Sequence, residues 1–540
     1  MSGCGQTRRR AVVGSRQGAG RARGPYIRRM RTPLVAAGLL FALVSALPAQ
    51  QENGRYQPIA AWTTPYVEHL IRAGVLRDPD PLTRPLRRAD LRRALSEVDT
   101  AASPSAVRAI IRLLARELEE PVDSVRWRLG AAVGALAASD ARRWAERPAA
   151  DSAGLFPQAG LAMSLEMPHL TLVTHPAIDN RLLYDPDYTG KKDRIVAGRN
   201  EDAYVLFSSR YLDAFFGIED RNWGPPVSEG LLLSPSPYGF DHLLLRIGPR
   251  RLRLEMLVTQ LDALTPWTDS ARAVTRGLTL HRLVVTPSDA VAFSFFEGLL
   301  YAGTPDGPRF LEPWYVNPLN SLLLAQYQDA PQGNSLLGFD VTTSVGRAAR
   351  LSAQFYLDDF QVDRGSAGDR EPPSYGFTIL GTGGFRRGAL SWSAVYTRVT
   401  NLSYRTPANQ EQYTLRGVGI ARNFSDYDQA TFRVTSAAAP RLLVTGEATM
   451  IRQGEGDMRL RYPAISDFPS TATFLQGVVE RTVRLGAQGV WTPRADATLS
   501  ADLARHFVTN AGHVAGASEQ RWVWRIRAEL RRSYSGVVRW

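Results

Sequence analysis

The chain of 540 residues contains very little cysteine or histidine and, after its N-terminus, no long apolar run. Its single cysteine, Cys4, stands in a stretch that we expect to be removed, so the mature protein would have no disulfide and no thiolate. The seven histidines are scattered, and neither H-E-x-x-H nor G-x-S-x-G occurs. We therefore expect no metal site, no cofactor and no enzymatic activity. The runs after residue 49 fall short of the roughly 18 apolar residues of a membrane-spanning helix.

Two weak enzymatic signals remain in the sequence. An outer-membrane lipid hydrolase needs neither of these motifs, so His175 or His242 with a nearby serine and acid is one catalytic alternative. Isolated histidines in strands or loops are far commoner than catalytic ones. The glycine-rich segment Gly381–Gly384 lacks the following helix of a phosphate-binding loop, and we interpret it as a strand turn.

The first 49 residues predict a secretory signal peptide. They contain nine arginines, no acidic residue and an apolar run, Leu34–Leu47, that ends just before Ala49. Met30 is an alternative start of this signal. Subtracting the nine arginines from the formal net charge of +13 leaves +4, so the mature chain is only mildly basic. We expect no nucleic-acid partner.

Residues 50–122 predict a small helical bundle or plug. Thr64-Pro65 is typical of a helix start, and Gly74 is typical of a helix end. A second helix follows near Leu91, and the clearest helical spacing of apolar residues starts after Ser103-Pro104.

From residue 123 to residue 540 the apolar period changes to two, which predicts strands. The clearest case is the last stretch, where Trp522, Trp524, Ile526 and Leu530 alternate with charged residues. Arg521–Trp540 is too long for one membrane crossing of about 9–11 residues, so the strand extends beyond the membrane or turns near Arg532–Gly536. The same alternation recurs through the chain without an interrupting helix.

These strands favour a mainly β fold: a large antiparallel transmembrane β-barrel with a small N-terminal α-helical bundle. At about 20–25 residues per strand and connection, the segment would give roughly 16–20 strands. The many charged residues on the inward parity, such as Arg253 and Arg484, require a wet or salt-bridged lumen. The predicted location is the bacterial outer membrane.

One stretch is similar to a known family, the capsule assembly Wzi family. Aromatic strands (Tyr204–Phe207, Tyr211–Phe216) precede Asn222-Trp223-Gly224-Pro225, Gly230–Ser234 and an aromatic step to Phe240. Later segments and the helical start also resemble this family: Trp62–Leu95, Glu297-Gly298, Glu312–Pro318 and Asn334–Asp340.

The resemblance implies an outer-membrane barrel with a helical bundle at its periplasmic end and a lectin-like, non-enzymatic role. Its partners would be exported capsular or extracellular polysaccharide of acidic character, outer-membrane lipid and the barrel-assembly machinery. The alternatives are a porin or diffusion channel and, less favoured, a lipid hydrolase. From the family motif we carry over Asn222, Trp223, Ser234 and the structural pair Gly224 and Pro225.

Arg221, Asn222, Trp223 and Ser234 are the predicted polysaccharide-binding residues. An exposed tryptophan stacks on sugar faces, and arginine and asparagine bond to hydroxyls or carboxylates. The competing interpretation makes Trp223 a headgroup-level anchor, with Gly224-Pro225 turning the chain. Lys191-Lys192 is either a polysaccharide-facing loop or a solvated turn.

Overall fold

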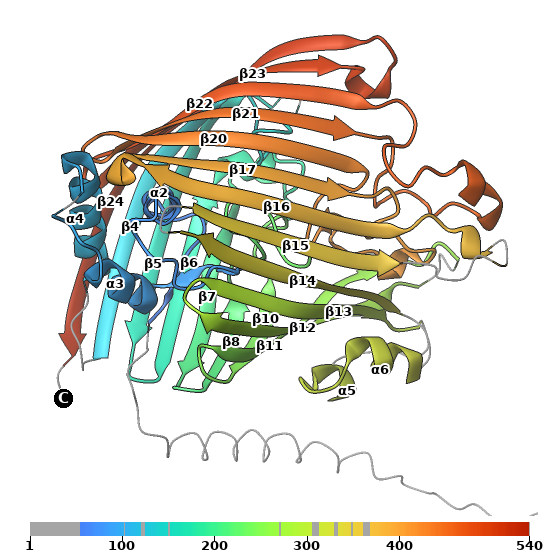
Figure 1. The fold of residues 1–540 in the computed structure, drawn as a ribbon, viewed down its shortest axis with the longest axis horizontal. Helices are drawn as coiled ribbons and strands as arrows, with labels where there is room; N and C mark the ends of the chain where they lie inside the picture. Colours follow the sequence, from blue (N-terminus) through green and yellow to red (C-terminus); the bar gives the residue numbers. More distant parts are fainter. Residues whose placement is uncertain are drawn as a thin grey trace, which may run out of the picture. The chain divides into compact units, whose positions relative to one another are not determined.

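A closed antiparallel barrel of eighteen strands forms most of the protein (Figure 1). The structure is a computed structural model. It describes residues 54–538 except 102, 120–124, 150–151, 269–271, 305–312, 329–332, 347–348, 360–364 and 366–367. The predicted signal peptide at 1–49, Glu312 and Trp540 lie outside the described residues. The mainly β fold and the strand number expected from the sequence are confirmed.

Each wall strand pairs with its neighbours in the chain, and β24 closes the ring by pairing with β4. The wall strands are β4 (Val125–Ala138), β5 (Gly154–Glu166), β6 (Leu170–Asp179), β7 (Gly198–Ser208), β8 (Leu212–Ile218), β10 (Asp241–Ile247), β11 (Leu252–Leu264), β12 (Val274–Ser288), β13 (Val291–Ala302), β14 (Gly333–Val345), β15 (Ala349–Asp359), β16 (Ser374–Phe385), β17 (Leu390–Val399), β20 (Tyr427–Ala439), β21 (Leu442–Gln453), β22 (Glu480–Arg494), β23 (Ala497–Thr509) and β24 (Ser518–Val538). Gly381–Gly384 lies within β16, so its interpretation as a turn was wrong.

The alternation of side chains has the predicted meaning. On β24, Trp522, Ile526 and Leu530 expose 55%, 50% and 61% of their surface on the outside of the wall. A face of large apolar side chains left this exposed fits hydrocarbon rather than water. β24 contains no turn. Its last residues, up to Val538, pair only with β4, so the strand extends beyond its other neighbour.

The two ends of the barrel differ in their connections. At one end the strands join through short turns, such as residues 440–441 and 495–496. At the other end the connections are long, such as residues 219–240, 400–426 and 454–479, and the first two fold into the lumen, where Leu231 and Tyr404 share one buried core. We call these the short-turn end and the long-loop end.

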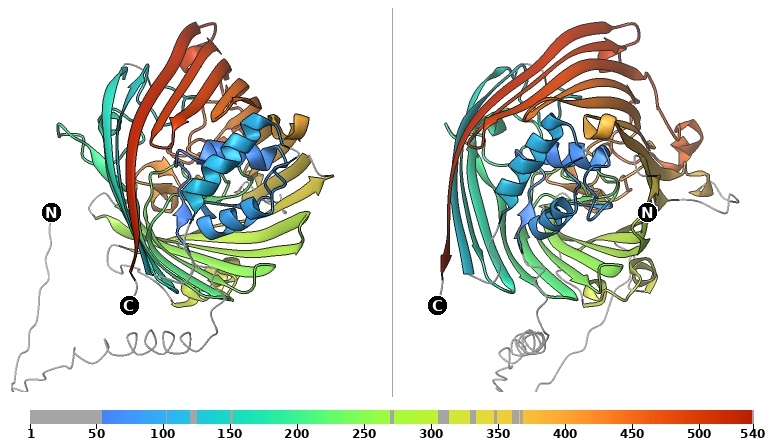
Figure 2. Two further views of the ribbon diagram at one scale, coloured as in Figure 1. Left: turned by 90° about the vertical axis from the view of Figure 1, so that its left-hand side faces the viewer. Right: turned by 60° about the vertical axis from the view of Figure 1, so that its left-hand side comes forward.

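Three amphipathic helices lie at the short-turn end, where Figure 2 shows them within the ring of strands. They are α2 (Thr64–Arg72), α3 (Arg88–Ser96) and α4 (Ser105–Leu118). Their apolar faces pack on one another and on Ala437 and Leu443 of the wall. None of the helices in the described residues has the length and apolarity to cross a membrane.

Two further helices were missed by the sequence analysis. α5 (Pro313–Val316) and α6 (Leu322–Gln328) lie in the connection from β13 to β14, on the outside of the wall (Figure 1). Leu299 and Tyr301 share the parity of the 60%-exposed Phe295, yet they are buried against Tyr315 and Leu322 of this connection. The helices are too short to give a periodic signal.

Candidate functional site

The predicted Asn222–Pro225 motif lies inside the barrel rather than on a surface loop. β9 (Asn222–Trp223) forms a two-stranded ladder with β2 (Thr83–Arg84), which belongs to the N-terminal segment. The Gly224 amide donates to the Leu82 carbonyl at 3.0 Å and extends this ladder. Chain entering from the short-turn end therefore meets chain folded in from the long-loop end. We call β2, β9 and residues 219–240 around them the plug.

Asn222 and Trp223 are held by the plug itself. The Asn222 side chain donates to the Ser228 carbonyl at 2.9 Å and accepts from the Gly230 amide at 2.6 Å. Trp223 is about 1% exposed and packs in the main lumenal core with Leu231, Leu232 and Leu233. The Trp223 ring therefore cannot stack on a sugar unless this core opens.

Arg221 and Ser234 are equally enclosed. The Arg221 guanidinium lies 4.2 Å from the Phe215 ring centre and 4.9 Å from that of Tyr56, and its Nε donates to His242 at 2.6 Å. The Ser234 hydroxyl donates to the carbonyl of Ala421 in another inward-folded connection. Their role in binding a ligand stays a prediction, and the contacts give all four residues a structural role.

Gly224 is required by its conformation. Its φ of +145° is unfavourable for other residues, and a Cβ here would lie 2.7 Å from the Gln354 side-chain oxygen. Gln354 in turn donates to the Trp223 carbonyl and accepts from the Leu231 amide. Pro225 follows directly and is buried.

A buried arginine on the wall anchors the plug. Arg282 of β12 donates to the Leu82 carbonyl at 2.9 Å and to the Thr83 hydroxyl at 3.0 Å. It also donates to the Ser294 hydroxyl at 3.0 Å and pairs with Asp340 of β14 at 2.8 Å, and both charged side chains have no exposed surface. Its guanidinium also lies 5.4 Å from the centre of the Trp223 ring.

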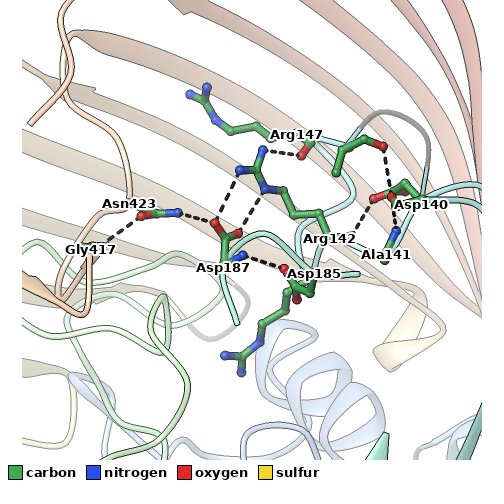
Figure 3. Close-up of polar contacts among 12 residues, drawn as sticks. Asp140, Ala141, Arg142, Arg147, Asp185, Asp187, Gly417 and Asn423 are labelled. Carbon is green, nitrogen blue, oxygen red and sulfur yellow. Dashed lines mark hydrogen bonds and ion pairs between the residues drawn. The ribbon is translucent and has the colours of Figure 1, made fainter. Parts of the chain in front are cut away.

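Side chains of different connections contact one another at the long-loop end. Arg142 pairs with Asp187 at 3.1 Å, and Asn423 donates to the same carboxylate at 3.2 Å, so three connections meet there (Figure 3). Arg181 pairs with the fully buried Asp185 at 2.6 Å. Lys191 and Lys192 lie exposed in this region, and the Lys192 ammonium donates to the Asp185 carbonyl.

Arginines with exposed surface gather on neighbouring connections of the long-loop end. Arg459 donates to the Gly417 carbonyl at 2.7 Å and so holds the segment of Arg416 beside that of Arg461. Arg416 and Arg461 are exposed. We call these three residues the outer arginine patch. Among nearby aromatic side chains, Phe474 stacks under Arg398 at 4.2 Å.

A cavity of about 580 Å³ lies between the inner face of β24, β4, β5, β6 and β7 and the N-terminal segment 55–63, with Glu219 and Asp220 of the plug at one end. Its lining runs from Asp496 at a short turn to Asp179 at the long-loop end of β6. Trp62 lines the first part, with the Arg531 guanidinium 4.1 Å from its ring centre. A space of this size fits a small organic molecule.

Glu219 of the plug lines the far part of this cavity. It is about 3% exposed, and no hydrogen-bond donor among the described residues reaches its Oε2 atom. Burial raises the pKa of Glu219 well above its ordinary range, and the nearby Asp202 carboxylate raises it further.

The inward arginines mostly brace the wall, as predicted. Arg253 pairs with Glu255 at 3.2 Å, and Arg484 pairs with Glu447 and Asp502. Arg251 is exposed in a turn and braces nothing in the lumen. Of the two histidines considered for hydrolysis, His175 pairs with Asp202 at 3.2 Å and His242 stacks on Phe215.

Comparison with solved structures identifies the same architecture elsewhere. The chain is similar to Wzi of Escherichia coli, described as an outer-membrane protein involved in group 1 capsule assembly and a carbohydrate-binding β-barrel, with 12% identity and a TM-score of 0.57. The match covers 88% of this chain and 99% of Wzi. OpdK of Pseudomonas aeruginosa matches at 11% identity and a TM-score of 0.43, over 76% of this chain and 99% of that one. No family model and no curated protein sequence matches the chain.

The closed wall, its apolar outside and its charged inside define the class: the protein is a bacterial outer-membrane β-barrel. Within this class, the Wzi structure shares its fold. The fold and location expected from the sequence are confirmed.

Sequence analysis singled out Asn222–Pro225 but did not find the segments that pair with this motif in the lumen. The pairing of β2 with β9 joins two-residue strands far apart in the chain, for which no periodic signal exists. Glu219-Asp220-Arg221 reads like a solvated loop, because three consecutive charged residues usually are one. The flanking aromatic residues give no signal either, because Phe215 is buried and Phe216 is 61% exposed.

Proposed function

We propose that the protein retains an acidic exported polysaccharide at the cell surface, without catalysing a reaction. In this proposal the short-turn end and its helices face the periplasm, and the long-loop end faces outward. Outer-membrane barrels have short turns on the periplasmic side and longer loops on the extracellular side. Residues 1–49 would direct export, and the barrel-assembly machinery would insert the mature chain among outer-membrane lipids.

The observation that carries the proposal is the filled lumen. The plug joins the two ends through the β2–β9 ladder and is packed around Trp223 and Leu231–Leu233. A barrel filled by a core of this kind is suited to presenting a rigid outer surface rather than to passing solutes. The carbohydrate-binding description of the similar Wzi barrel supports the same assignment.

The outer arginine patch supplies the chemistry for an acidic polymer. Guanidinium groups bind carboxylates through paired hydrogen bonds, and a patch of exposed charge attracts a polyanion most strongly at low salt. Arg416 and Arg461 are free to turn toward solvent, whereas Arg459 holds the loops together. Binding should therefore depend on Arg416 and Arg461 and weaken as salt rises.

Deletion of the gene in its host tests the physiological role. We expect surface polysaccharide to appear in the culture medium and return to the cells on complementation. Complementation with the double variant Arg416→Gln, Arg461→Gln should restore less retention than the wild type. The control is Arg112→Gln, Arg116→Gln, which removes two exposed arginines of α4 at the other end. Unchanged retention in the deletion strain contradicts the proposal.

A diffusion channel is the second candidate, because the cavity beside the plug reaches from the short-turn end to the long-loop end of the wall. Conductance of the purified protein in planar bilayers separates the two functions. A polysaccharide-retaining barrel with this plug should stay closed. Steady ion conductance of the wild type would favour the channel.

A further inference from the structure

The cavity between the wall and the N-terminal segment 55–63 has charges of opposite sign at its two ends. The far end has an excess of carboxylates from the outer part of the wall and from the plug, among them Asp179, Glu201, Asp202 and Glu219, and Arg199 also lines it. Arginines, including Arg55, Arg88, Arg128 and Arg531, line the part near the short-turn end. A molecule inside it therefore meets a region that favours a cation and a region that favours hydroxyls or anions.

The carboxylates at the far end are not all neutralised by the protein. Asp179 pairs with Arg181 at 3.3 Å, Asp202 with His175 at 3.2 Å and Asp220 with Arg143 at 2.8 Å. Glu219 differs, because it forms no ion pair with the described residues; its Oε2 atom also has no hydrogen-bond donor among them, although the side chain is almost wholly buried. A buried carboxylate oxygen without a hydrogen bond destabilises the protein, and a donor from a ligand would offset this loss.

We propose that this cavity binds a saccharide carrying a single protonated primary amine, with the ammonium group at Glu219. An ammonium group supplies both the missing hydrogen-bond donor and the positive charge that the neighbouring Asp202 and Glu201 favour. The sugar body points toward the short-turn end, where Arg128 and Trp62 offer hydrogen-bond donors and an aromatic surface. A linear polyamine is disfavoured, because its further charges would lie among arginines.

The geometry of β8 sets the position of Glu219. Gly217 has a φ of +138°, and a Cβ at this position would lie 2.1 Å from the Ala203 carbonyl oxygen of β7. Only glycine allows β8 to lie this close to β7 just before the chain turns into the lumen. The site is independent of the outer arginine patch, because it lies inside the barrel.

The test is titration calorimetry of the purified full-length mature protein in detergent, with glucosamine as the probe. N-acetylglucosamine is the matched probe, because it keeps the ring and loses the charge. We expect glucosamine to bind, N-acetylglucosamine to bind at least tenfold more weakly, and spermidine to bind more weakly than glucosamine. Equal binding of the two sugars, or no binding of glucosamine, would overturn the proposal.

Variants locate the site. Glu219→Gln keeps the shape and removes the charge, and we expect at least a tenfold loss of glucosamine affinity. Asp496→Asn, a carboxylate of the same cavity at its other end, should leave the affinity within twofold of the wild type. Should Glu219→Gln fail to fold, Glu201→Gln replaces it at a more exposed side chain, with at least a threefold loss expected. Unchanged affinity in the folded variant contradicts the assignment.

Discussion

Replacement of Arg282 by methionine should open the barrel by releasing the plug. The guanidinium links the wall to the N-terminal segment through the Leu82 carbonyl and the Thr83 hydroxyl, and it neutralises Asp340. In the variant, Asp340 stays buried without its cation as long as the plug remains docked. Undocking lets water reach the carboxylate, so the change favours the undocked state.

The magnitude follows from the burial of the pair. Arg282 and Asp340 both have no exposed side-chain surface, and removal of one partner of such a pair costs about 3–5 kcal/mol. Because about 1.4 kcal/mol corresponds to a factor of ten, the ratio of docked to undocked plug should fall by roughly a hundredfold to several thousandfold. This loss is enough to populate open barrels if the plug is only moderately stable.

Two assays should respond together: conductance in planar bilayers should rise, and the segment 75–87 should become accessible to protease. Arg494→Met, at an exposed arginine of β22, is the control and should behave like the wild type. The double variant Arg282→Met, Asp340→Leu removes both charges and should recover much of the closed behaviour. Wild-type conductance and protection in the single variant would refute the anchoring role of Arg282.

Three smaller predictions concern the plug and the helices. Asn222→Ala leaves the buried Gly230 amide without its acceptor and should lower the free energy of unfolding by about 1–3 kcal/mol, measured by chemical denaturation. Gly224→Ala should destabilise by about 1–3 kcal/mol through its φ and the contact with Gln354, and an unchanged denaturation midpoint would contradict this. Burial and, to a lesser degree, Arg72 lower the pKa of His69 in α2 to about 4. Because the undocked histidine binds a proton near pH 6.5, docking of α2 should weaken by up to roughly 3 kcal/mol between pH 6.5 and 4, seen as faster hydrogen exchange in α2 and absent in His69→Gln.

The sequence predicted the wall better than the lumen, for a physical reason. A wall strand meets hydrocarbon on one side along its whole length, so Trp522, Ile526 and Leu530 repeat a pattern that can be recognised without other information. The plug forms from short segments whose partners are set by the closed ring around them. Trp223 illustrates the difference. Its exposure depends on whether residues 219–240 fold outward or inward, and the local sequence does not determine this direction.

Many charged side chains on the inner face of the wall pair with the N-terminal segment 75–87 rather than face a water-filled lumen. Arg253 pairs with Asp80 at 3.0 Å and Arg350 with Asp78 at 3.1 Å, while Arg87 of the N-terminal segment pairs with Asp213 of β8. Deleting residues 75–87 would expose the wall charges to water, which solvates them at little cost. Neutralising one partner within the intact protein instead leaves a buried charge unpaired. We therefore expect the wall to tolerate deletion of residues 75–87 better than it tolerates a single neutral substitution in one of these ion pairs.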